Sequence, residues 1–109
     1  VSDTIREKDG LAMSSRNAYL SPVQREEALF IFKSLQRAVK LVKDGIIECE
    51  KIKEEVHTLL NQGKLIRVDY VEIVDRQNLE SISNIIPNHS IIVLAAWVEK
   101  VRLIDNHLL

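Results

Sequence analysis

Cysteine, glycine, proline and aromatic residues are all scarce in this chain of 109 residues. It has one cysteine, three glycines and two prolines, and 5% of its residues are aromatic. The single cysteine, Cys49, excludes an internal disulfide and indicates a reducing compartment, so we expect a cytoplasmic protein. A lone thiol without a histidine close by in the sequence is usually inert, and we expect no reactive role for Cys49.

A strong charge of either sign and a long apolar run are also missing. Lys and Arg number 15 against 16 for Asp and Glu, so the net charge is −1. That balance gives no indication of nucleic acid or an anionic membrane as a partner. The longest apolar run, residues 91–98, is too short to span a bilayer, and no secretory signal precedes it. Apolar residues make up 46% of the chain, which predicts one globular domain over residues 1–109. Because the chain begins at Val1 instead of a methionine, we expect a fragment or a processed product.

The clearest helix signal begins at Ser21. Ser21 suits the N-cap, Pro22 suits the first helical position, and Gln24 completes a capping box. Apolar residues then recur at spacings of four and three, which predicts one buried face. They are Ala28, Phe32, Leu35, Val39 and Val42, widened by Ile31 and Ala38. Gly45 is expected to end this helix.

A second helix is expected from Glu48 to Asn61, followed by Gly63. Its apolar stripe comprises Ile52, Val56, Leu59 and Leu60. Both helices carry paired carboxylates, Glu26-Glu27 and Glu54-Glu55. Since adjacent residues on a helix do not face each other, we interpret these pairs as surface residues and not as acid–base pairs.

Strands are expected after the helices. Residues 68–74 alternate, which places Asp69, Val71, Ile73 and Asp75 on one face and Val68, Tyr70, Glu72 and Val74 on the other. Residues 76–86 form a connector with a short helical turn around residues 79–82, and Pro87-Asn88 signals a turn. The nearly continuous apolar run Ser90–Trp97 predicts a central strand covered on both faces.

A third strand is expected over Val101–Ile104. The short gap before it implies a tight hairpin, although Glu99 is unsuited to the φ > 0 positions of a two-residue turn and so predicts a longer or different one. Asp105-Asn106 would then form a turn with a structural role. Together these elements predict an α+β fold, a small and mainly antiparallel three-stranded sheet with two helices packed on one face.

One stretch, residues 5–20, has residue types suited to chemistry. Charged residues lead to Gly10, which tolerates φ > 0, and two hydroxyls, a guanidinium and an amide follow at Ser14, Ser15, Arg16 and Asn17. Arginine offers a planar fork of donors that matches phosphate oxygens, so the pattern suits an anionic ligand. From spacing alone, ordinary helix capping by these residues is the alternative.

The same stretch carries a resemblance. Arg6 to Leu20 reads Arg-Glu-x-Asp-Gly-Leu-Ala-Met-Ser-Ser-Arg-Asn-x-Tyr-Leu and resembles the segment that opens the C-terminal domain of the pantothenate synthetase (pantoate–β-alanine ligase) family. Its Met-Ser-Ser-Arg part is similar to the mobile lysine-serine (KMSKS-like) loop of class I aminoacyl-tRNA synthetases. Ala95-Ala96-Trp97 and Arg102–Asn106 form a second match at about the family's separation. Two positions depart from the family, which usually has proline at Asp3 and glycine near Glu99.

The resemblance implies a ligase that makes pantothenate from pantoate, β-alanine and ATP with Mg²⁺, through a pantoyl-adenylate. In this family the domain acts as a lid, and residues 1–20 would form the leading segment and ATP-phosphate loop. The implied ATP-binding residues are Ile5, Met13, Ser14, Ser15 and Arg16. Asp9 and Gly10 would shape the loop, and no residue here is certain to be catalytic.

The resemblance also implies partners outside this chain. The family's Rossmann-like N-terminal domain carries most pantoate contacts, so the fragment alone is expected to be inactive, and the full-length enzyme is expected to be a homodimer. Two alternatives stay open, a non-catalytic module that binds a phosphate or a partner's carboxylate and an interaction domain that uses its helices. The scattered histidines His57, His89 and His107 suggest no metal site. Trp97 is interpreted as a packing residue.

Overall fold

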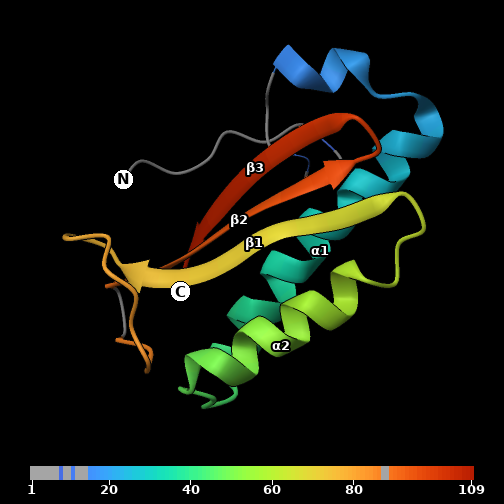
Figure 1. The fold of residues 1–109 in the computed structure, drawn as a ribbon. Helices are drawn as coiled ribbons and strands as arrows, with labels where there is room; N and C mark the ends of the chain where they lie inside the picture. Colours follow the sequence, from blue (N-terminus) through green and yellow to red (C-terminus); the bar gives the residue numbers. More distant parts are fainter. Residues whose placement is uncertain (1–7, 9–10, 12–14, 87–88) are drawn as a thin grey trace.

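A computed structural model describes residues 8, 11, 15–86 and 89–109, without the side chains of Ser15 and Arg16. A short 3-10 turn precedes two helices and three strands. These elements are η1 (Ser15–Tyr19), α1 (Pro22–Lys43), α2 (Cys49–Leu60), β1 (Ile66–Asp75), β2 (Ser90–Val98) and β3 (Val101–Leu108). The strands form an antiparallel sheet in the order β1-β2-β3, and the two helices lie together on one side of it (Figure 1). The predicted α+β fold with a central β2 is confirmed.

Local chemistry sets both ends of α1, as the sequence predicts. The Ser21 hydroxyl accepts a hydrogen bond from the Gln24 backbone N–H at 3.2 Å, and Gln24 Oε1 accepts one from the Ser21 N–H at 2.9 Å. This reciprocal pair satisfies two donors that the first helical turn would leave unpaired. At the far end the C-cap residue Asp44 is followed by Gly45, whose φ of 95° turns the chain away from the helix.

The core lies between the helices and the sheet, and the buried stripe of α1 differs from the prediction. Its members are Ala28, Ile31, Ser34, Leu35, Ala38 and Leu41. Three members of the predicted stripe, Phe32, Val39 and Val42, are only partly buried. A spacing of 3.6 residues per turn allows either line of residues, and contact with the sheet selects the one through Ile31 and Leu35. Ser34 fits the core because its hydroxyl donates to the Ile31 carbonyl at 2.7 Å.

The second helix follows its predicted stripe closely. Cys49, Ile52, Val56 and Leu60 are buried, whereas Leu59 is partly exposed. Glu48 and Asn61, the predicted end residues, are its two caps. Between β1 and α2, the Lys53 ammonium lies 2.9 Å from a Glu50 carboxylate oxygen and 3.8 Å from one of Glu72.

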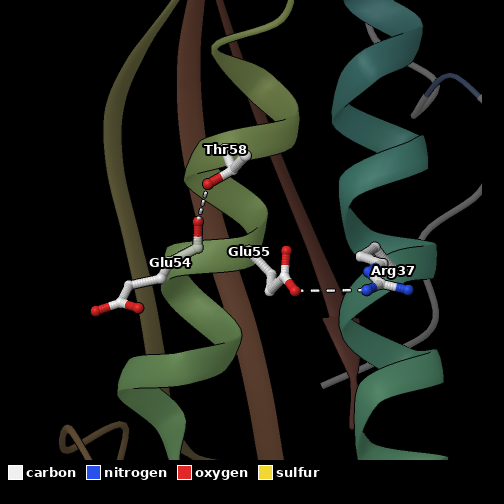
Figure 2. Close-up of polar contacts among 4 residues, drawn as sticks. All are labelled: Arg37, Glu54, Glu55 and Thr58. Carbon is white, nitrogen blue, oxygen red and sulfur yellow. Dashed lines mark hydrogen bonds and ion pairs between the residues drawn. The ribbon is translucent and has the colours of Figure 1, made fainter.

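An arginine–glutamate contact also crosses from α1 to α2. Arg37 Nη2 lies 3.4 Å from Glu55 Oε1, and Figure 2 shows the two side chains pointing toward one another across the helices. On the next turn of α2 the Thr58 hydroxyl donates to the Glu54 carbonyl at 2.9 Å. Since both partners of the ion pair are well exposed, we expect it to add at most about 1 kcal/mol.

The alternation predicted for the first strand is interrupted. The register of β1 against β2 shifts between Val68 and Tyr70, which marks a β-bulge. Val68 therefore packs toward the same core as Val71 and Ile73, although the prediction put it on the opposite face. The extra residue, Asp69, faces solvent, and its Oδ2 accepts a hydrogen bond from Arg102 Nε at 2.9 Å. A bulge re-aims side chains in this way because two residues oppose one on the partner strand.

The connector after β1 contains no helical turn, contrary to the prediction. The Asp75 carboxylate accepts hydrogen bonds from the Gln77 and Asn78 N–H groups at 2.8 and 3.3 Å, and Leu79 has a φ of 59°. The chain thus folds back, and Ser81 forms an isolated bridge with Val74. Hydrogen bonds from the backbone to the Asp75 carboxylate therefore favour an Asx-type turn over a helical turn at this position. The predicted turn at Pro87-Asn88 and the departure at Asp3 lie outside the described residues.

The hairpin between β2 and β3 is a two-residue turn, so of the longer or different turn predicted at Glu99 the longer one is wrong. Val98 pairs with Val101, and Glu99 adopts a φ of 54°. Two contacts accompany this conformation. The Glu99 N–H donates to the Leu65 carbonyl at 3.0 Å, and its carboxylate accepts from Gln24 Nε2 at 2.7 Å.

The third strand runs further than predicted and includes the two residues assigned to a turn. Leu94 pairs with Asp105 and Val93 with Asn106, so both lie within β3. Asp105 is on the core face and only 3% exposed, and its Oδ1 accepts a hydrogen bond from the Asn106 N–H at 2.7 Å. Strand pairing with the apolar β2 outweighs the local turn preference of these side chains.

Candidate functional site

The predicted phosphate loop leads into η1. Ser15 and Arg16 are the first two residues of this turn, but their side chains lie outside the description. Ile5, Asp9, Gly10, Met13 and Ser14 also lie outside the described residues. The structure therefore positions the backbone at the end of the predicted loop and leaves the roles of these seven residues as predictions.

Leu11 and Asn17, which lie on either side of Ser14-Ser15-Arg16 in the sequence, both pack against the body of the domain. Leu11 is 3% exposed and belongs to the main core cluster. Asn17 in η1 is 8% exposed, and its carbonyl accepts a hydrogen bond from the Leu20 N–H at 3.2 Å. The turn lies beside β3 and immediately before α1, at the same end of the molecule as the β2–β3 hairpin (Figure 1). Residues 15–20 thus have a defined place at this end.

The sequence analysis missed the structural role of one carboxylate near this end. Glu27, interpreted as a surface residue, accepts hydrogen bonds at Oε1 from the backbone N–H groups of Lys64 and Leu65 at 2.5 and 2.8 Å. It thereby holds the loop that connects α2 to β1. No local pattern signals this role, because the partners are 37 and 38 residues away.

The histidines are not brought together. His57 is in α2, His89 precedes β2, and His107 is near the end of β3. Among the described residues, no group of three or more histidine, cysteine or acidic side chains could hold a metal ion. In that same part of the chain, no helix is long and apolar enough to cross a membrane.

In the part of the chain that the structure describes, two shallow grooves flank the helices. One of about 370 Å³ lies between α1 and α2 and is lined by Leu41, Ile46, Lys51, Glu54, Glu55 and Thr58. The other, of about 390 Å³, lies between α1 and β3 and is lined by Phe32, Gln36, Val39, Lys40, Lys43 and His107. The first contains the polar contacts of Figure 2, which are satisfied within the domain.

Cys49 is the first residue of α2 and is completely buried. Burial raises the pKa of its thiol above the ordinary value, and the nearby Lys53 ammonium only partly offsets this effect. A raised pKa leaves the protonated thiol dominant at neutral pH, and the protonated form is a poor nucleophile. The structure thus supports the interpretation of Cys49 as an inert packing residue.

The burial of Cys49 predicts different rates of alkylation in the folded and the unfolded protein. In the native protein at neutral pH, we expect Cys49 to react with a thiol reagent about 10³-fold or more slowly than in denaturant, because reaction requires opening of the core. The measurement is the rate of single-label incorporation with and without urea. Equal rates under the two conditions would show that the N-terminus of α2 is exposed in solution.

Comparison with known proteins decides the family. The family model described as pantoate-beta-alanine ligase matches residues 1–108. The chain belongs to the pantoate–β-alanine ligase family. It is 49% identical over 105 residues to the pantothenate synthetase of Thermotoga petrophila and 52% identical over 106 residues to the pantoate–β-alanine ligase of Lotus japonicus. Each alignment covers 96% of this chain, but only 37% and 33% of the respective relative.

Solved structures of the family share this fold. The pantothenate synthetase of Thermus thermophilus superposes with a TM-score of 0.87 at 31% identity, covering 96% of this chain and 37% of that one. A pantoate–β-alanine ligase from Francisella tularensis, solved with β,γ-ATP and β-alanine, gives a TM-score of 0.55 at 25% identity, covering 96% and 31%. The chain therefore spans about a third of the length of its relatives and corresponds to one domain of a pantoate–β-alanine ligase.

Proposed function

We propose that this chain is the C-terminal lid domain of an ATP-dependent ligase that condenses pantoate with β-alanine. The observation that carries the proposal is the family match over residues 1–108, nearly the whole chain. Relatives at 49% and 52% identity bear the names of this activity, and one solved relative binds an ATP compound and β-alanine. The partner would be an N-terminal Rossmann-like domain of the same polypeptide.

The proposed reaction has two steps. A pantoate carboxylate oxygen attacks the α-phosphorus of ATP and expels pyrophosphate, and the amine of β-alanine then displaces AMP from the pantoyl-adenylate. Negative charge develops on the phosphates in the first step, so fixed donors and Mg²⁺ supplied with ATP would do most of the catalytic work. Ser14, Ser15 and Arg16 are the proposed donors on this domain, with Met13 and Ile5 contacting the nucleotide through their backbones.

The proposed contribution of this domain is closure. A loop that contacts the phosphates only when the lid is shut would also exclude water from the adenylate, which is prone to hydrolysis. The docked η1 turn next to α1 gives such a loop a firm base at its C-terminal side. Asp9 and Gly10 would shape its N-terminal side. Cytoplasmic location and a homodimeric full-length enzyme stay predictions.

The full polypeptide that carries this chain tests the proposal. With pantoate, β-alanine, ATP and Mg²⁺ we expect pantothenate, AMP and pyrophosphate in equal amounts, measured by chromatography and a pyrophosphate assay. Omission of pantoate should abolish pyrophosphate release. Binding of ATP without any pantoate-dependent release would favour the alternative, a non-catalytic phosphate-binding module.

The isolated chain provides the matched control. It should fold, because its helix, strand and capping signals agree with one another, yet give no turnover above background. Positioning of two substrates accounts for much of an enzyme's rate, and this domain holds only one side of the proposed site. We expect millimolar ATP affinity at best, about −4 kcal/mol. Turnover, or micromolar binding mapped by NMR outside residues 5–17, would contradict the lid assignment.

A further inference from the structure

The start of α1 is tied to the end of the sheet by a contact between residues far apart in the sequence. Gln24 Nε2 donates a hydrogen bond to Glu99 Oε1 at 2.7 Å, although 75 residues separate the two. The other side-chain atom of Gln24, Oε1, is engaged by the Ser21 N–H at 2.9 Å. One side chain therefore closes the capping box and reaches the β2–β3 hairpin at the same time.

A second contact fixes the same helical turn to a second loop. Glu27 Oε1 accepts hydrogen bonds from Lys64 and Leu65, and the Leu65 carbonyl in turn accepts the Glu99 N–H at 3.0 Å. The loop approaches so closely that a Cβ at Gly63 would clash with Ile66 Cγ2 and lie 3.0 Å from Glu27 Oε2. Helix, loop and hairpin thus form one connected cluster, which we call the α1 clamp (Gln24, Glu27, Leu65 and Glu99).

The conformation of Glu99 fits a role for its side chain in this cluster. Its φ of 54° lies in the left-handed region, where glycine would be unstrained. Glycine could not reach Gln24, however, whereas the glutamate carboxylate does so at 2.7 Å. The hairpin therefore retains a strained residue whose side chain holds the start of α1.

We propose that the α1 clamp positions the η1 turn, which begins with Ser15 and Arg16. Only Leu20 and Ser21 separate η1 from α1, and the capping box fixes Ser21 to the first turn of the helix. A shift of that turn would therefore move η1. The catalytic consequence rests on the proposed ligase function; the positioning itself does not. Gln24 and Glu99 are positioning residues in this view, and neither touches substrate.

A swap of the two side chains isolates the clamp. Gln24→Glu keeps a carboxylate oxygen for the Ser21 N–H, but replaces the donor facing Glu99 with a second negative charge. Glu99→Gln retains an acceptor for Gln24. In the double variant the Gln24→Glu carboxylate accepts from the Glu99→Gln amide, so the contact is restored in reverse. Gln36→Glu, the same substitution at an exposed position of α1, is the control.

In the full polypeptide, Gln24→Glu should raise KM for ATP about fivefold, the effect of losing one solvent-exposed hydrogen bond. KM for pantoate should change less than about twofold in this variant, because most pantoate contacts are expected from the N-terminal domain and not from the loop before α1. The double variant and Gln36→Glu should behave like the unmodified protein. An unchanged KM for ATP in Gln24→Glu, or a change that the swap does not reverse, would overturn the proposal.

Hydrogen exchange gives a readout that needs no catalysis. Amides of residues 15–20 should exchange faster in Gln24→Glu and return to the original rate in the double variant, as local opening becomes easier and then harder. If the polypeptide lacks ligase activity but shows this pattern, the proposed function fails and the clamp stands. If residues 15–20 exchange at the same rate in all four variants, the positioning role of the α1 clamp is contradicted, even if the enzyme is active.

Discussion

Replacing Leu35 with alanine is expected to lower the free energy of unfolding by about 2–5 kcal/mol. Leu35 is fully buried in the middle of α1, within the core cluster between the helices and the sheet. Truncation removes apolar contacts on all sides and leaves a cavity that the surrounding strands can fill only in part. For a domain of this size, with a net stability of about 5–15 kcal/mol, the loss is a large share of the total.

Phe32 is the informative comparison, because the sequence predicts it within the buried stripe of this helix. Truncation of a phenylalanine to alanine in a core costs about 3–5 kcal/mol. The partial exposure of Phe32 at the groove beside His107 now predicts a smaller loss than for Leu35, despite the larger side chain. Urea unfolding of both variants, with midpoints and slopes compared, makes the measurement. A larger loss for Phe32→Ala would mean that α1 is rotated toward the predicted stripe.

The elements predicted well are those with local causes. The capping box at Ser21 involves residues three apart, and Gly45 ends α1 through its own backbone freedom. The apolar run of β2 was long enough to indicate a central strand without knowledge of its neighbours. Each of these signals lies within about one turn or one strand, which is the range over which sequence patterns are reliable.

The failures share a dependence on distant partners. The bulge at Val68–Tyr70 is a feature of the pairing with β2, and no sequence pattern within β1 predicts it. Asp105 has the local preference of a turn residue, but it lies within β3 and pairs with Leu94 of β2. Glu99 adopts a positive φ in a two-residue hairpin and contacts Gln24 and Leu65, which are far from it in the sequence. Such contacts are decided by tertiary packing, which overrides propensity.

The candidate site also has one part that the sequence predicted and one part that it did not. The motif at Arg6–Leu20 identified the family from the sequence alone, and the comparisons confirmed that family. The long-range contacts at the start of α1 could not be predicted, because the sequence assigns Gln24 only to the capping box and Glu27 only to the helix surface. Their partners, Glu99 and Leu65, are 75 and 38 residues away. A motif is recognised from neighbouring residues, whereas a contact such as that of Gln24 with Glu99 joins residues that are far apart along the chain.

Substituting alanine for Arg16 in the full polypeptide is expected to slow pyrophosphate release about 10²–10³-fold, equivalent to roughly 2–4 kcal/mol of transition-state stabilisation. The reason is the proposed contact between its guanidinium and the ATP phosphates, where charge develops as pyrophosphate leaves. Arg16 lies in η1, before α1 begins, and belongs to no apolar stripe. The unfolding midpoint should therefore stay the same.

Two further substitutions make the Arg16 prediction specific. Arg16→Lys keeps the charge but loses the planar fork, so its rate should fall between those of Arg16→Ala and the unmodified protein. Lys8→Ala removes an exposed cation from the same stretch of sequence that is not one of the motif's defined residues, and should leave the rate within about twofold if general electrostatic attraction contributes little. Stopped-flow measurement of pyrophosphate release at saturating pantoate gives the rates. Release at the normal rate in Arg16→Ala would exclude Arg16 from the site, and an equal loss in Lys8→Ala would replace the specific contact with a general effect of positive charge.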